Sequence, residues 1–77
     1  MHIRIFRVWA VKTYAGTGGN KGKLADDMKA DRQFISGRSK QRNLAMLKCR
    51  EASSGVLDTF EEMWAEYEDY KRECRNA

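Results

Sequence analysis

Residues 58–74 read DTFEEMWAEYEDYKREC, and this stretch decides the fold of the chain. Its apolar side chains recur at steps of three or four residues, which places them on one face of an α-helix; they are Phe60, Met63, Trp64, Tyr67, Tyr70 and Cys74. The opposite face is acidic and easily solvated; it carries Glu61, Glu62, Glu66, Glu68 and Asp69. We therefore predict a long amphipathic helix whose aromatic face forms the core, with Trp64 at its centre.

Both ends of this helix carry the expected signals. Asp58 or Thr59 can accept a hydrogen bond from a free N–H group of the first turn, and Glu61 or Glu62 follows three residues later, as in a capping box. Acidic residues near the start and Lys71, Arg72 and Arg75 near the end suit the helix dipole. The pattern predicts a helix from Asp58 to about Cys74.

The length of 77 residues corresponds to one domain, residues 1–77, close to the lower size limit for an unassisted core. A hydrophobic fraction of 42% and an adequate supply of aromatic residues favour a folded protein over a disordered one. No apolar run approaches the roughly 18 residues of a membrane span. Arg4 and Arg7 interrupt the short apolar start, so we expect no signal peptide, no membrane partner and a cytoplasmic location.

The two cysteines, Cys49 and Cys74, lie in different predicted elements and form no CxxC pattern. In a reducing compartment this spacing favours two half-buried thiols over a disulfide. Together with His2 they are too few to hold a metal ion. We therefore expect no metal and no cofactor.

Charge is distributed unevenly along the chain. Residues 1–50 hold 12 basic and three acidic residues, a net charge of +9, whereas residues 51–77 hold three basic and eight acidic residues, a net charge of −5. Two interpretations are open. The basic part binds an anionic partner, or the acidic helix docks against the basic part and neutralises it within the molecule.

Residues 3–14, IRIFRVWAVKTY, carry signals of both a helix and a strand. Ile3, Phe6, Ala10 and Thr13 share one helical stripe with Trp9 beside it, while the β-branched residues and the alternation that begins at Ile3 permit a strand. The helical spacing of the aromatic residues favours a helix. Whether that helix covers the whole stretch stays open.

Glycine-rich breaks separate the remaining elements. Residues 16–22, GTGGNKG, are predicted to be a loop because four glycines disfavour a helix interior. A second helix follows over residues 21–31, capped by Asn20, with Leu24, Ala25 and Met28 facing inward. Phe34 and Ile35 then plug the core from a turn.

Residues 36–39, SGRS, form the second break, and Ser39 can cap a third helix over residues 40–52. The inward side chains of that helix are predicted to be Leu44, Met46, Leu47 and Cys49. Residues 53–55 end it, and Val56 and Leu57 lead into the final helix. The fold class is therefore all-α, a compact bundle of four to five helices with a long C-terminal helix.

Three stretches resemble the YozE-like small bacterial proteins, which have a sterile-alpha-motif-like (SAM-like) fold. Residues 6–10, FRVWA, are similar to the family's opening Phe-x-x-Trp followed by a small or apolar residue. Residues 22–34, GKLADDMKADRQF, resemble its G-x-L-A-[DE]-D-x-x-x-D-x-x-F block, and residues 57–67, LDTFEEMWAEY, resemble its L-x-T-F-[DE]-x-x-W-x-x-Y ending. The resemblance implies a SAM-like helical domain and brings no catalytic residues with it.

The chain also departs from that family. Ile35 stands where the family usually has proline, the first loop lacks the usual acidic or proline residues, and the third helix is basic where it is often acidic. These departures concentrate positive charge in a variable surface.

The glycine-rich stretch fails as a nucleotide-binding P-loop. That motif needs G-x-x-x-x-G-K-[ST], but Thr17 occupies the first glycine position and Leu24 follows Lys23. One alternative is a hairpin whose backbone N–H groups grip a DNA phosphate, with Lys21 and Lys23 at a helix N-terminus. The other is a flexible surface loop.

The third helix, SKQRNLAMLKCR, is the second candidate for a nucleic-acid site, since Gln41 and its basic residues could straddle phosphates. An ordinary solvated face is the alternative. The predicted nucleic-acid-binding residues are Lys21, Lys23, Arg38, Lys40, Arg42, Lys48 and Arg50.

No pair of residues is typical of catalysis. The carboxylates of the last helix are spaced as solvent-facing residues, and His2 has no serine or cysteine beside it in the sequence. We expect neither an enzyme nor a small-molecule substrate.

Two kinds of binding function remain. The first is weak, non-specific DNA association through the basic loop and third helix. The second is protein–protein interaction, as an adaptor or as an accessory, anti-defence protein of a phage or other mobile element. It would use the acidic helix, through Glu62, Glu66 and Asp69.

Overall fold

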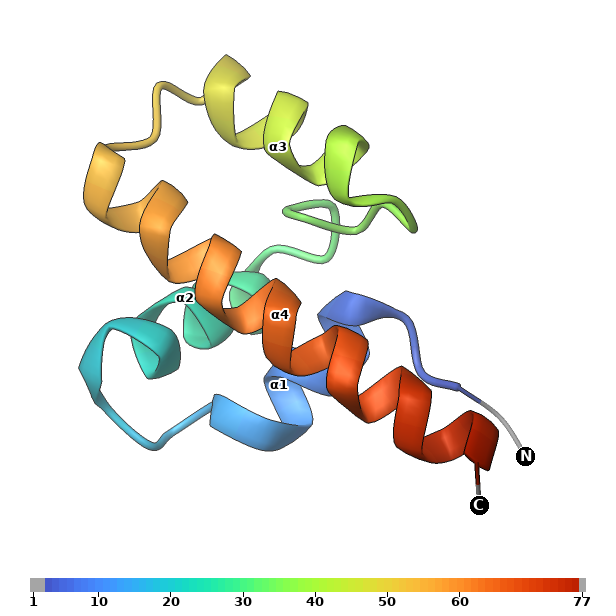
Figure 1. Cartoon of the computed structure of the whole chain (residues 1–77). Coiled ribbons are helices and arrows are strands. Elements are labelled where there is room, and N and C mark those ends of the chain that lie inside the picture. The colour runs from blue at the N-terminus through green and yellow to red at the C-terminus, as the bar shows by residue number, and fades with distance from the viewer. Residues whose placement is uncertain (1–2, 77) are drawn as a thin grey trace.

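The long helix α4, Ser54–Asn76, crosses the whole molecule, and the other helices pack along it (Figure 1). The computed structural model describes residues 3–76, so His2 lies outside the described part. In chain order the helices are α1 Phe6–Tyr14, α2 Gly19–Ala30, α3 Lys40–Cys49 and α4. The described residues contain no strand. The prediction of an all-α bundle with a long C-terminal helix is confirmed, with four helices.

α4 begins before Asp58, so the predicted capping box at Asp58 or Thr59 is wrong. The Ser53 hydroxyl oxygen accepts a hydrogen bond of 3.3 Å from the Val56 N–H, and the Thr59 hydroxyl donates to the Gly55 carbonyl inside the helix. Val56 packs against the core. That packing outweighs the roughly 1 kcal/mol by which Gly55 disfavours a helix interior.

Aromatic rings from α1 and α4 form the core. The Phe6 ring packs against Phe60, Trp64 and Tyr67 with centroid distances of 5.3, 4.9 and 5.4 Å. Trp9 and Ala10 are also buried. Thr13, which was predicted on the same inward stripe, is exposed.

α1 starts at Phe6, and Ile5 before it is extended. The observed helix therefore occupies only the last nine residues of the stretch 3–14 that was predicted to be helical. Two tyrosines of α4 hold this extended start. The Tyr67 hydroxyl donates to the Arg4 carbonyl at 2.7 Å, and the Arg4 N–H donates to the Tyr70 hydroxyl oxygen at 3.1 Å.

α2 begins at Gly19 directly after Gly18, so the predicted loop is shorter than residues 16–22 and the predicted Asn20 cap is wrong. Gly22 is buried within the helix. A Cβ atom there would lie 3.0 Å from Thr17 Oγ1, so glycine allows α2 to pack closely on the end of the preceding loop. The predicted inward residues Leu24, Ala25 and Met28 are all buried.

The turn after α2 inserts Phe34 and Ile35 into the core, as predicted. Ser39 caps α3 as predicted, because its hydroxyl oxygen accepts from the Arg42 N–H at 3.2 Å. The buried Asn43 side chain clamps Gly37, accepting from its N–H at 2.9 Å and donating to its carbonyl at 3.1 Å.

α3 ends at Cys49 and not near Ala52. Glu51 has a left-handed φ of 56°, and the N–H groups of Glu51 and Ala52 donate back to the carbonyls of Lys48 and Leu47. This is a Schellman ending. Leu47 is buried and Leu44 and Met46 are half-buried, but Cys49 is exposed, which corrects its predicted inward direction.

Candidate nucleic-acid interface

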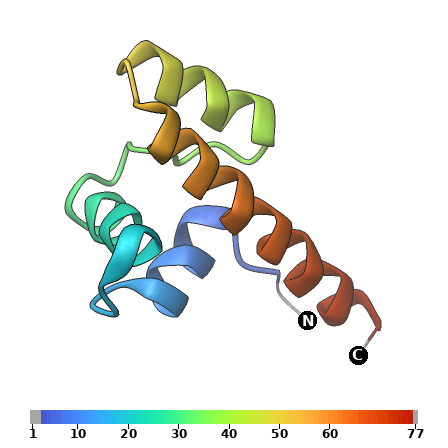
Figure 2. The ribbon, with the colours of Figure 1, turned by 60° about the vertical axis from the view of Figure 1, so that its left-hand side comes forward.

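α3 is the outermost helix, and among the described helices it packs on α4 alone. No other element covers its outer side in the two ribbon views (Figures 1 and 2). Five of its residues are exposed and fall at helical spacing on that outer face: Gln41, Arg42, Ala45, Lys48 and Cys49. The helix contains no acidic residue. Its outer face is therefore mainly polar and basic, with the small side chain of Ala45 at the centre.

Three of the seven predicted nucleic-acid-binding residues are held in ion pairs within the molecule. Lys21 pairs with Glu66 at 2.5 Å, Lys40 with Glu61 at 2.7 Å and Arg50 with Asp31 at 3.0 Å. The other four form no ion pair within residues 3–76: Lys23, Arg38, Arg42 and Lys48. Neutralisation within the molecule therefore applies to three of the seven predicted residues.

Arg50 is fixed from two sides. Its guanidinium group lies 4.6 Å from the Phe34 ring centroid and bridges to Asp31 across the turn. The Gln33 backbone N–H and Arg50 together lower the pKa of the Asp31 carboxyl group below its ordinary value. Because Arg50 is engaged in this way, it stabilises the turn that precedes α3.

Lys21 and Glu66 were predicted in two different sites, but they meet in one cluster. Glu66 of α4 also accepts a hydrogen bond from the Tyr14 hydroxyl of α1. Hydrogen bonding to Glu66 is the main cause that raises the pKa of both Tyr14 and Lys21. Burial opposes ionisation of Glu66, but the bonds from Lys21 and Tyr14 outweigh it and lower the pKa of Glu66. The cluster ties α1, α2 and α4 together.

The glycine-rich loop faces a small hollow of about 360 Å³ that is shared with acidic α4. Gly18, Gly19 and Lys21 line it together with Glu62. A phosphate entering this hollow would meet the Glu62 carboxylate, and the ammonium group of Lys21 is already bonded to Glu66. The arrangement is unfavourable for the predicted phosphate grip by the loop.

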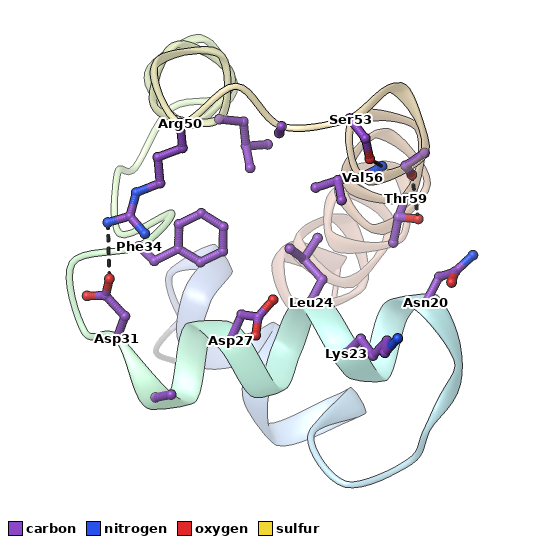
Figure 3. Close-up of a pocket in the computed structure, with 14 residues that line it drawn as sticks. Asn20, Lys23, Leu24, Asp27, Asp31, Phe34, Arg50, Ser53, Val56 and Thr59 are labelled. Atoms are coloured by element: carbon purple, nitrogen blue, oxygen red, sulfur yellow. Dashed lines mark hydrogen bonds and ion pairs between the residues drawn. The ribbon is translucent and has the colours of Figure 1, made fainter.

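A larger groove of about 740 Å³ lies between α2 and the connection from α3 to α4 (Figure 3). Its apolar lining comes from Leu24, Phe34, Leu47 and Val56. Its polar lining carries both signs of charge, from Lys23, Asp27, Asp31 and Arg50. Lys23 therefore faces this groove and does not join the outer face of α3.

Arg38 is exposed just before α3. Burial is the main cause that raises the pKa of the Tyr67 hydroxyl, and the positive charges of Arg38 and Arg75 act in the opposite direction. No sequence signal predicts the influence of Arg38 on Tyr67, because the two residues are far apart in the chain. By contrast, the exposed spacing of Gln41, Ala45 and Lys48 could have been read from the helix period.

The acidic residues predicted for the alternative, protein-binding site also divide into exposed residues and one that is bonded within the molecule. Glu62 and Asp69 are exposed, whereas Glu66 belongs to the Tyr14–Lys21 cluster. Asp69 pairs with Arg72 at 3.0 Å on the same helix. Four of the exposed carboxylates of α4 follow one solvent-facing stripe at helical spacing: Asp58, Glu62, Asp69 and Glu73. The fifth, Glu61, pairs with Lys40 of α3.

Comparison of the chain with protein-family models, with curated proteins and with solved structures found no match. Among the described helices, none has the length and apolar character needed to cross a bilayer. Within residues 3–76 no three His, Cys, Asp or Glu side chains gather as a metal site requires.

Proposed function

We propose that this protein binds duplex nucleic acid through the outer face of α3 and the arginine that precedes it. The main supporting observation is that α3 exposes two cations, Arg42 and Lys48, that form no ion pair within residues 3–76, and that the helix itself has no acidic residue. Arg38, before the helix N-terminus, is a third exposed cation without an ion pair among the same residues. Such cations bind by displacing condensed counterions from phosphates. The glycine-rich loop and Lys21 are not part of this proposed surface.

The salt dependence of binding tests the proposal. If Arg38 and Lys48 each neutralise one phosphate, log affinity should fall against log salt concentration with a slope of about −1.8, and of about −2.7 if Arg42 neutralises a third, since each phosphate contributes about −0.9. Fluorescence anisotropy with a labelled generic duplex measures this slope. A flat salt response, or no binding at low salt, would overturn the proposal.

A pair of matched double variants locates the surface. Arg42→Glu with Lys48→Glu should remove most of the binding. Lys12→Glu with Lys29→Glu makes the same change in net charge at exposed positions on α1 and α2 and should leave most of it. Equal losses in the two variants would mean that net charge, not α3, governs association.

The proposed role is a binding module without catalysis. Tyr14, Lys21 and Glu66 form a compact cluster of titratable groups that joins three helices, and hydrogen bonding to Glu66 raises the pKa of the tyrosine and of the lysine from values that already lie above neutral pH. Neither is thus available as a general base. The order and spacing of its motifs support a place beside the YozE-like, SAM-like proteins, and we propose a cytoplasmic location on the composition of the chain.

The acidic stripe of α4 supports a second candidate, interaction with a basic protein surface. Asp58, Glu62 and Glu73 are exposed and form no ion pair among the described residues. If the duplex assays fail, Glu62→Lys with Asp69→Lys is the variant with which to test this stripe. If that variant still binds an identified protein partner, the acidic stripe is not the binding surface.

A further inference from the structure

We infer that α3 reads base edges in the major groove of DNA, so that the protein prefers particular sequences and is not purely non-specific. This inference rests on the proposed function and deepens it. Phosphate contacts alone carry no sequence information, whereas hydrogen-bonding side chains at base edges do. The outer face of α3 holds both kinds of group.

The dimensions of α3 suit the major groove. An α-helix with its side chains is about 10–12 Å across, and the major groove of B-form DNA is about 12 Å wide. α3 packs on α4 alone among the described helices, so its outer side is free to enter. Ala45 lies at the centre of the exposed face, where a small side chain allows close approach to the groove floor.

The side chains around Ala45 match the acceptors and donors of base edges. Arg42 can donate both arms of its guanidinium group to the N7 and O6 atoms of guanine, and Gln41 can pair with the N6 and N7 groups of adenine. The methyl group of Ala45 suits the methyl group of thymine. Lys48 lies about 9 Å further along the helix from Arg42, close enough to reach the phosphates that border the groove.

The orientation of α3 is fixed by packing, as a recognition helix requires. Ser39 caps its first turn, and the buried Asn43 holds Gly37 by two hydrogen bonds. A Cβ atom at Gly37 would lie 2.7 Å from the Asn43 side-chain oxygen, so the turn fits against α3 without spare room. Leu47 is fully buried on the inner side. The outer residues therefore face solvent in one defined arrangement.

The carboxylates that contact residues at the two ends of α3 are paired within the molecule. Asp31 pairs with Arg50, Glu61 pairs with Lys40 at the first residue of the helix, and α3 itself carries no acidic residue. Glu51 is exposed, but it lies beyond the last turn. Charge complementarity thus favours insertion of the Gln41–Ala45 end. The proposed insertion into the major groove also favours DNA over RNA, because the major groove of an A-form duplex is too deep and narrow for side chains to read.

Selection from a library of random DNA duplexes by the full chain tests the inference. We expect a short enriched motif with a fixed G·C pair for Arg42 and a neighbouring fixed A·T pair for Gln41, bound roughly five- to hundredfold more tightly than a scrambled duplex, as one bidentate base contact provides. Replacing the guanines of the motif by 7-deazaguanine, which lacks the major-groove N7 acceptor, should reduce this preference. The same sequence as an RNA duplex should show none.

Gln41→Ala and Arg42→Ala should each relax the preference at one base pair. Gln33→Ala is the matched control, because Gln33 is an exposed glutamine in the turn after α2 and should leave the motif unchanged. Salt-dependent binding without an enriched motif would overturn this inference and leave the proposed function standing. A motif insensitive to Gln41→Ala, Arg42→Ala and 7-deazaguanine would also overturn it, whereas absence of any duplex binding would overturn the proposed function itself.

Discussion

Glu66 lies on α4 between Tyr14 of α1 and Lys21 of α2, and each of its carboxylate oxygens accepts one hydrogen bond. The three side chains therefore titrate as a linked group. The pKa of Glu66 is lowered from 4.5, and the pKa values of Tyr14 and Lys21 are raised from 10.0 and 10.5. A lowered carboxyl pKa contributes stability above its unfolded value, which is lost as pH falls through the folded pKa. A raised pKa contributes stability below its unfolded value, which is lost as pH rises through the folded pKa.

We predict that Glu66→Gln lowers the free energy of unfolding by about 0.5–1 kcal/mol at neutral pH, the range for a half-exposed charge-assisted pair. The deficit should shrink well below pH 4.5, where wild-type Glu66 also becomes neutral. Urea denaturation at both pH values measures it. Glu62→Gln, on the same helix but without an ion pair among the described residues, is the control. A deficit that is equal at both pH values would contradict the ionic role.

Among the helices, α3 ends with a strained backbone conformation at Glu51. Glu51 occupies the left-handed position of the Schellman ending, with a φ of 56°. Residues with a Cβ atom are disfavoured there by roughly 1–2 kcal/mol, and glycine is not. The strained residue lies in the connection between the proposed interface helix and α4.

We predict that Glu51→Gly stabilises the protein by about 1 kcal/mol and raises the melting temperature by about 4–8 °C. Glu62→Gly makes the same chemical change in the interior of α4 and should instead destabilise it by roughly 1 kcal/mol. Thermal melts followed by circular dichroism distinguish the two signs. Destabilisation by both variants would show that the left-handed position carries no relievable strain.

For the molecule as a whole, stability depends on the aromatic contact between α1 and α4. Trp64 is almost fully buried, packs against Phe6, and donates from its indole N–H to Glu68 at 2.9 Å. Four helices share this one hydrophobic cluster. A chain of this size has a small margin of stability, so the loss of one such ring affects every element at once.

We predict that Trp64→Ala lowers the free energy of unfolding by about 3–5 kcal/mol and abolishes a cooperative thermal transition. Trp64→Phe keeps an aromatic ring in the core, loses only the indole hydrogen bond and part of the volume, and should still fold. The melt by circular dichroism checks both variants. A cooperative transition of Trp64→Ala within a few degrees of wild type would refute the central role of this ring.

The helical class, the aromatic face of α4 and the buried residues of α2 could all be predicted from the amino-acid pattern alone. Those features depend on spacings of three and four residues, and such periodicity is local. The Ser39 cap was likewise readable, because the cap and its first turn are adjacent in the chain. Glycine propensity misled at Gly22, since the close packing of α2 against Thr17 overrides a local preference of about 1 kcal/mol.

Only the tertiary structure decided which charges are available to a partner. Lys21 and Glu66, and likewise Lys40 and Glu61, come from separate helices, so no sequence period links them. The same is true of the exposure of α3, which follows from its packing on α4 alone. Ion pairing acts through space over a few ångströms, whereas sequence patterns describe neighbours along a helix. The basic residues were therefore visible in the sequence, but the subset that remains unpaired on α3 was not.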